Sequence, residues 1–461
     1  MREVRIVVEP FEFVSYLSIE CMKKLNEHGN MKMRGIIKTA NVDSYLEYAA
    51  RETWVTVKLI SDEDWIRDYF TGILTDLTIE KEGEVHVLNL EVKTGSFLLD
   101  LKKHIRSFQT DGFRYAEMAR ICMKNEAAKC VIAEAEEASA DGLIFQYRET
   151  DWEFMRRIAS YAHVPLIALD HKSVKNCCLG YQAGGAVEMK VEDYRMTRDY
   201  GAFLEREGER YAKIEDYIYY TVHSREVYDL GSRVLFAGQE RVVGRISSKL
   251  IGQELYHEYQ LISREQGILN PLYNRNMAGV SVKAHVTAVE KTMVCVQIDE
   301  DENKGECGSR WFDYATVYST PDGTGWYCMP EVGDEVRLIV PEDKEEKAYV
   351  ASSVHLGAAG GRVDPNIKFW KNRQKKEIRF TPDGIVLTNN AGNRIEISDS
   401  EGIRIVSDKD ITLQADGEMK IKSSNAAVNM DAQSEILLQQ GAAVIAMKDE
   451  INISGGKIYM N

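Results

Sequence analysis

The C-terminal part of the chain repeats a short unit in which two apolar residues flank one residue that is mostly polar. Side chains at positions i and i+2 point to the same face of a strand, so each unit predicts a short strand with one apolar face. Turn-forming residues such as those of Asp399–Gly402 lie between the units. The first residues of four successive units follow at intervals of eight: Ile395, Ile403, Ile411 and Met419. The sequence therefore predicts an array of short strands and turns over residues 378–461.

One chain of this kind cannot enclose a core, because a repeat of eight residues supplies only one short strand and one turn. Several identical chains that wind together can do so, and three is the smallest number that closes a prism of strands. We therefore expect an intertwined triple-stranded β-helix in a homotrimer. A small β-sandwich is the alternative, but its strands are normally longer and less evenly spaced. The residues expected to line the trimer axis are Ile395, Ile397, Ile403, Ile405, Ile411, Leu413, Met419, Ile421, Val428, Met430, Ile436, Leu438, Ile451, Ile453, Ile458 and Met460.

Residues 278–356 contain several short runs of alternating apolar and polar positions, separated by turn formers, which predict a compact β-barrel. A five-stranded OB-fold barrel is the expected form, with Trp311, Trp326 and Pro330 holding it together. The stretch 357–377 begins with glycines and ends with basic residues. It is expected to be a neck or linker between the barrel and the repeat array.

Residues 1–277 mix β segments with helical segments. Apolar residues at Trp152, Met155, Ile158 and Ala162 form a stripe with helical spacing. Helices are expected at three places: 97–105, 115–122 and 152–162. The pattern favours a hub of two β-barrel-like domains with a helical insertion. The whole chain is thus expected to be mostly β, with an α+β N-terminal part.

Charge and composition narrow the range of functions. The net charge of the chain is −15, and a trimer would carry three times that charge. Because binding to nucleic-acid phosphates needs a basic surface, no nucleic-acid partner is expected. The start of the chain lacks an apolar core flanked by positive charge, and no stretch approaches about 18 uninterrupted apolar residues. We therefore expect neither a signal peptide nor a transmembrane helix, and folding in the cytoplasm.

The sequence offers no recognisable catalytic or metal-binding motif. Its nine His are scattered, and its eight Cys form no Cys-x-x-Cys pair, so reduced packing cysteines are expected. The acidic run Asp299–Glu302 is interpreted as a solvated hairpin tip. Glu149 and Asp151 are interpreted as acidic groups that complement a helix dipole. No catalytic residue, metal or cofactor is expected, and the chain is not expected to be an enzyme.

Local motifs resemble one family, the VgrG and phage late-control-D proteins. Ser96–Leu101 followed by Arg106–Gln109 resembles the N-terminal half of these proteins, and Phe145–Ile158 resembles their Gln-Tyr-x-Glu-Ser segment. Gly325–Val336 and Ala348–Val354 resemble their OB-type domain. The residues that carry the hub part of the resemblance are Arg106, Phe108, Gln146, Tyr147, Glu149 and Phe154.

The resemblance implies a trimeric spike and hub at the tip of a contractile injection machine: a phage tail, a tailocin, an extracellular injection system or a type VI secretion system. It implies contacts with inner tube and baseplate proteins, and a needle that helps to puncture a target envelope after assembly in the bacterial cytoplasm. Some members carry a lysozyme domain between barrel and needle; this chain has only the neck there, so muramidase activity is not expected. Other members bind iron through His near the tip; the last His here is His355, before the needle, so no such site is expected. A separate PAAR-type protein is expected to cap the tip. The alternatives are a receptor-binding β-helical fibre or adhesin and a cell-wall-hydrolysing spike.

Overall fold

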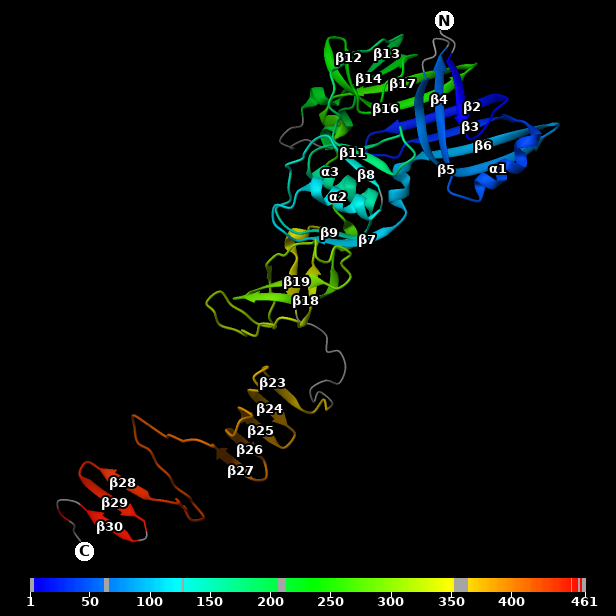
Figure 1. Ribbon diagram of the computed structural model, residues 1–461. Helices are drawn as coiled ribbons and strands as arrows, with labels where there is room; N and C mark the ends of the chain where they lie inside the picture. Colours follow the sequence, from blue (N-terminus) through cyan, green and yellow to red (C-terminus); the bar gives the residue numbers. More distant parts are fainter. Residues whose placement is uncertain are drawn as a thin grey trace. The chain divides into compact units, whose positions relative to one another are not determined.

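The computed structural model describes residues 4–61, 66–126, 128–205, 213–351, 364–448, 450–454 and 457 (Figure 1). The chain divides into two compact units, Met1–His355 and Leu356–Asn461. Strands far outweigh helices, which confirms the mostly β fold class. No helix among the residues described has both the length and the apolar character needed to cross a membrane.

The first unit is built on one large sheet of twelve strands. Its main path runs β1-β4-β5-β6-β3-β2-β16-β17-β14-β13, with β15 beside β16 and β12 beside β15. The strands are β1 (Val4–Glu9), β2 (Ser15–Lys24), β3 (Asn30–Ile37), β4 (Trp54–Ser61), β5 (Ile66–Glu82), β6 (Val85–Thr94), β12 (Val187–Glu188), β13 (Asp193–Arg198), β14 (Ile218–Ser224), β15 (Arg233–Phe236), β16 (Gln239–Ile251) and β17 (Glu254–Ile262).

Two segments from opposite ends of the hub meet in this sheet, because β2 pairs with β16 in antiparallel register, with Met22 opposite Ser247. The two β-domains expected within residues 1–277 therefore share one continuous sheet. Each half keeps its own apolar core, one that includes Met31 and Phe70 and one that includes Val243 and Tyr259.

The helical insertion separates the two halves of the sheet in sequence. Its strands and the helices of the unit are β7 (Lys103–Phe108), β8 (Lys129–Ile132), β9 (Ile144–Thr150), β10 (Leu166–Ala168), β11 (Asn176–Leu179), α1 (Val42–Ala49), α2 (Tyr115–Asn125), α3 (Asp151–Tyr161) and α4 (Tyr200–Glu205). The 3₁₀ helices among the described residues are η1 (Thr39–Asn41), η2 (Gly95–Asp100), η3 (Ile214–Tyr217), η4 (Glu265–Gly267), η5 (Arg275–Met277) and η6 (Glu345–Lys347).

Two of the three expected helices are confirmed as α2 and α3. The start of α3 is fixed by a capping box, in which Thr150 Oγ1 accepts a hydrogen bond from Glu153 N at 3.1 Å and Glu153 Oε2 accepts one from Thr150 N at 2.9 Å. The prediction of a helix at 97–105 is wrong. That stretch holds part of η2 and the first residues of β7, because β7 pairs with the distant strand β9 and this pairing overrides the local helical pattern.

A nearly closed five-stranded barrel follows the hub. Its strands run in the order β20-β19-β18-β21-β22, and a parallel bridge between Tyr314 and Val350 links the region after β20 to β22. Val286, Val296 and Leu338 belong to its aliphatic core, which Phe145 of β9 joins from the hub. The strands are β18 (Val280–Glu290), β19 (Met293–Ile298), β20 (Phe312–Asp313), β21 (Glu335–Val340) and β22 (Tyr349–Ala351).

The two tryptophans expected to hold this barrel together do not lie in its core. Trp311 is 38% exposed and Trp326 is 55% exposed, and Pro330 is half-buried. The barrel is narrow, and small aliphatic side chains together with Phe312 already fill its interior. The indole rings therefore remain at the surface of the single chain.

The second unit consists of two sheets of consecutive antiparallel hairpins (Figure 1). The first begins inside the expected neck 357–377, since Lys368–Lys371 forms a strand that pairs with the next. The described residues between Val406 and Ile436 contain no strand. The strands are β23 (Lys368–Lys371), β24 (Glu377–Thr381), β25 (Gly384–Thr388), β26 (Arg394–Ser398), β27 (Gly402–Val406), β28 (Ile436–Gln440), β29 (Ala443–Met447) and β30 (Ile451–Ser454).

Candidate functional site

The first tail sheet carries most of its apolar residues on one face, in two rows that cross the strands. Directly opposed residues of antiparallel strands point to the same face, so the pairing register defines these rows. One row runs through Trp370, Ile378, Leu387, Ile395 and Ile405. The other runs through Phe380, Ile385, Ile397 and Ile403. We call these nine residues the apolar rows.

The opposite face of the sheet is mainly polar and charged, although Phe369 and Val386 also lie on it. Arg379, Val386, Glu396 and Arg404 face one another there across β24 to β27. Arg394 Nε and Glu396 Oε1 form an ion pair at 3.2 Å. The polar residue in the middle of each repeat therefore lies in water, as the sequence pattern predicts.

The apolar rows remain open to solvent in the single chain. Ile397 is 45% exposed and Ile403 is 72% exposed, although both lie in the middle of strands. A contiguous exposed apolar face of this kind marks an interaction surface. Trp370 and the residues of β24 and β25 extend this face beyond the expected axis residues. For β24 and β25 the signal is present in the sequence, since both strands repeat the same apolar-x-apolar unit.

Most of the other axis residues whose side chains the structure describes are exposed as well. Six of them lie in the segment without strands, with exposed fractions from 49% to 69%: Ile411, Leu413, Met419, Ile421, Val428 and Met430. In the second tail sheet, Met447 lies opposite both Ile436 and Ile451, and Ile445 lies opposite both Leu438 and Ile453. The side chain of Ile453, and both Ile458 and Met460, lie outside the described residues.

A separate buried charge network joins the hub to the barrel. Arg106 of β7 donates hydrogen bonds to Gln146 Oε1 at 3.1 Å and to Asp151 Oδ1. Its Nε lies 3.7 Å from Glu302 Oε2 of the barrel. Burying a guanidinium requires such partners, because an unpaired internal charge costs several kcal/mol.

A second buried arginine lies in the same junction. Arg157 of α3 donates from Nε to Glu149 Oε1 at 2.9 Å and from Nη2 to Phe145 O at 3.0 Å, and its Nη1 pairs with Glu345 of the barrel. Burial alone would lower the pKa of Arg157, but Glu149 and Glu345 raise it above its ordinary value. This side chain therefore stays charged at any ordinary pH.

Of the six hub residues singled out in the sequence, three belong to this network directly. Arg106, Gln146 and Glu149 are hydrogen-bonded members of the network. Phe108 and Phe154 stack nearly parallel, with ring centroids 5.7 Å apart. The Tyr147 carbonyl accepts a hydrogen bond from Asn274 Nδ2 at 2.8 Å.

One interpretation of acidic residues is wrong, and another is incomplete. Asp301, in the run expected to be a solvated tip, is buried and accepts a hydrogen bond from Ser107 N at 3.1 Å. Glu149 and Asp151 act as buried partners of Arg157 and Arg106, beyond any effect on a helix dipole. The partners are separated widely in sequence, and no local signal could have revealed the pairs between hub and barrel.

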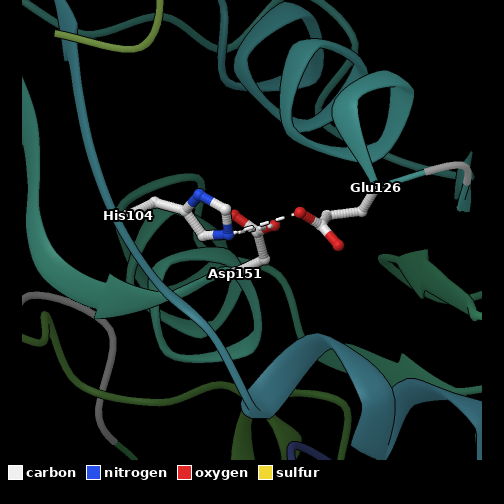
Figure 2. A group of neighbouring side chains, drawn as sticks. All are labelled: His104, Glu126 and Asp151. Carbon is white, nitrogen blue, oxygen red and sulfur yellow. Dashed lines mark ion pairs between the residues drawn. The ribbon is translucent and has the colours of Figure 1, made fainter.

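Three potential metal ligands converge beside Arg106 (Figure 2). His104 comes from β7, Glu126 from the C-terminal end of α2, and Asp151 from the start of α3. The Nε2 atom of His104 lies 3.4 Å from Glu126 Oε1 and 3.5 Å from Asp151 Oδ2. Sequence analysis missed this group because its members belong to three separate elements.

Comparison with known proteins gives no match to a family model or to a curated protein by sequence. Solved structures are similar in fold. The E. coli c3393 protein, described as a component of the type VI secretion system with structural similarity to the T4 bacteriophage tail proteins gp27 and gp5, matches with a TM-score of 0.52 at 13% identity, over 75% of this chain and 99% of that chain.

The Francisella PdpA–VgrG complex is similar as well. Its lidded form matches with a TM-score of 0.55 at 8% identity, over 88% of this chain and 80% of that chain. A lidless PdpA–VgrG complex matches with a TM-score of 0.54 at 9% identity, over 88% of this chain and 98% of that chain. At such identities the likeness concerns the fold, and it confirms the resemblance inferred from the motifs at that level. The chain therefore has the fold of the VgrG and gp27–gp5-like hub proteins.

Proposed function

We propose that the chain is the spike and hub subunit of a contractile injection machine, and that it works as a homotrimer with a structural role and no catalysis of its own. The observation that carries the proposal is the pair of apolar rows, which cross the first tail sheet and remain open in the single chain. The fold likeness to hub proteins supports the same assignment for the first unit.

The apolar rows favour association with copies of the same chain. Full burial of one large apolar side chain contributes roughly 1.5–3 kcal/mol. Covering the nine residues of the apolar rows in each chain would therefore strongly favour association of the chains. Three copies around a common axis would turn each sheet's apolar face inward and leave the face with Arg379, Glu396 and Arg404 in water. The segment 407–435 would gain partner strands from the other chains, which yields the intertwined β-helix expected from its repeat.

The first unit supplies the hub in this proposal. Its barrel forms the collar. The strands β18, β19 and β20 follow one another in antiparallel order, and a parallel bridge to β22 then closes the barrel, which suits an OB-type fold. The large sheet contacts inner tube and baseplate proteins. The likeness to PdpA–VgrG complexes supports protein partners for the hub. The subunit would assemble in the bacterial cytoplasm, carry a PAAR-type cap on its tip, and leave the cell on contraction to help puncture the target envelope.

The shape of the purified full chain in electron micrographs tests this proposal. We expect class averages with a threefold body and one thin, straight projection. Compact particles without a projection, or single chains with a tail that varies in direction, would contradict the spike assignment.

A further inference from the structure

The group His104, Glu126 and Asp151 lies where three elements of the hub insertion meet (Figure 2). His104 and Asp151 are both buried, and Glu126 is only partly exposed. The site therefore brings an imidazole and two carboxylates together in a poorly solvated place. Arg106 and Lys175 already offset part of the negative charge of this group, and a proton or a bound cation would offset the rest.

The tautomer of His104 decides which atom is available for a cation. Its Nδ1 lies 2.7 Å from Glu302 Oε2 and 2.9 Å from Arg106 Nη2. A carboxylate can only accept and a guanidinium can only donate, so the two contacts favour opposite tautomers; a metal at Nε2 requires the one in which Nδ1 donates to Glu302. The lone pair of Nε2 then points toward Glu126 and Asp151. In many zinc sites the histidine ligand donates its other ring N–H to a carboxylate that does not itself bind the metal.

Asp151 provides an independent indication of a ligand. Its Oδ1 accepts hydrogen bonds from Arg106 and from Gln146 Nε2, the latter at 3.0 Å. Its Oδ2 makes no hydrogen bond within the described part of the chain, although the residue is only 1% exposed. This unpartnered oxygen is the atom that faces His104 Nε2. Buried carboxylate oxygens are rarely left without a partner.

Two of the three spacings between donor atoms suit a small tetrahedral ion. Zinc bonds of about 2.0–2.1 Å in tetrahedral geometry place ligand atoms about 3.3–3.4 Å apart. The distances from His104 Nε2 to Glu126 Oε1 and to Asp151 Oδ2 are 3.4 Å and 3.5 Å. The imidazole favours zinc or a similar transition metal over calcium or magnesium, which prefer ligand sets of oxygen alone.

We propose that His104, Glu126 and Asp151 bind one zinc ion per chain. Lys175 Nζ lies 3.5 Å from Glu126 Oε2, and Lys102 Nζ lies 4.0 Å from Oε1, the atom that would bind the metal. The ion would join β7, the end of α2 and the start of α3, and Glu302 would couple the site to the barrel. The proposal assigns the metal a structural role at the junction between hub and barrel, independent of the proposed function of the whole chain.

Calorimetric titration of the chelator-treated full chain with zinc chloride tests this inference. We expect one zinc per chain, and loss of this binding in His104→Gln. Glu302→Gln should keep the site but weaken zinc binding about 10- to 100-fold, because only the orienting carboxylate is lost. His163→Gln, which changes an exposed histidine outside the site, should bind zinc as the unchanged chain does.

Cobalt substitution separates this site from adventitious binding to cysteine. We expect tetrahedral Co²⁺ absorption without a sulfur-to-metal charge-transfer band, and its loss in Glu126→Gln. Circular dichroism of each metal-free variant shows whether it is folded. If His104→Gln is unfolded, Glu126→Gln replaces it in the titration. A folded chain that takes up no zinc, or a His104→Gln variant that keeps the binding, would overturn the proposal.

Discussion

Ile397 of β26 lies directly opposite Ile403 of β27, and both side chains point to the same face of the tail sheet, where they are 45% and 72% exposed. Glu396 lies opposite Arg404 in the same hairpin and points to the other face. One hairpin therefore shows both features of the tail: a charged side suited to water, and an apolar side that needs a cover.

Ile397→Asp should weaken association of the chains strongly. The substitution removes an apolar side chain from the proposed interface and would place three carboxylates near one axis, at a cost above about 2 kcal/mol per chain. Light scattering as a function of protein concentration should show dissociation at concentrations where the unchanged protein is fully associated.

Glu396→Gln is the matched control, because it changes the neighbouring residue on the polar face. Its association should equal that of the unchanged chain, since surface substitutions usually alter stability by less than about 0.5 kcal/mol. Equal effects of the two substitutions would contradict the assignment of the faces.

Ile411→Asp tests the segment that contains no strand in the single chain. If residues 411–430 pair with other chains in the assembly, their backbone amides are protected from hydrogen exchange in the associated protein. We expect this protection to be lost in the variant, and to be retained after substitution of the neighbouring exposed residue in Lys409→Ala. Rapid exchange over 411–430 in the unchanged associated protein would contradict the intertwined tail.

Arg106→Met should destabilise the first unit by about 3–5 kcal/mol, because it leaves Asp151 as a buried charge without its main partner. Urea denaturation followed by tryptophan fluorescence measures the change. Adding Asp151→Asn should recover part of the loss, since no buried charge is then left unpaired.

Arg120→Met provides the comparison with an exposed ion pair. Arg120 and Glu136 are both about half exposed, and such pairs contribute at most about 1 kcal/mol. A loss of stability in Arg120→Met as large as that in Arg106→Met would show that the buried network does not stabilise the junction.

The stability of the hub should also fall in mild acid because of His257. Burial, helped by Lys23 and Arg67, lowers the pKa of His257 to about 3 in the folded chain, against 6.5 for an exposed histidine. The unfolded chain therefore binds one more proton between these pH values. The contribution of the neutral ring is complete above pH 6.5 and is lost as the pH falls from there toward 3, by up to about 1.4 kcal/mol per pH unit.

His257→Gln isolates this effect. The ring accepts or donates a hydrogen bond at 2.7 Å between its Nδ1 and Ser248 Oγ, and glutamine can make a similar bond without titrating. Between pH 6 and pH 4 the unfolding free energy of the variant should decline less steeply than that of the unchanged chain. Parallel declines would contradict the assignment of a buried neutral histidine.

The features that the sequence predicted well are those that repeat or that follow from local rules. The spacing of Ile395 and Ile403 predicts short strands with one apolar face, and the structure contains them as β26 and β27. The apolar stripe that begins at Trp152 predicts a helix, and the structure contains it as α3.

The features that the sequence did not reveal depend on contacts between distant segments. Asp301 and Glu302 resemble a solvated acidic turn until the fold places them against β7, where Ser107 and Ile105 donate to them. Trp311 resembles a core residue, but the barrel is already filled by smaller side chains. The spacing of apolar residues along the sequence does not show which distant segments will pack against each other.

The most direct test of the trimeric spike is the mass of the full chain in solution, measured by native mass spectrometry. The account predicts a single species of three times the 52.4 kDa chain mass, which persists on dilution. A species of one or two chains at the same concentrations would contradict it, because the apolar rows would then be covered in some other way or not at all.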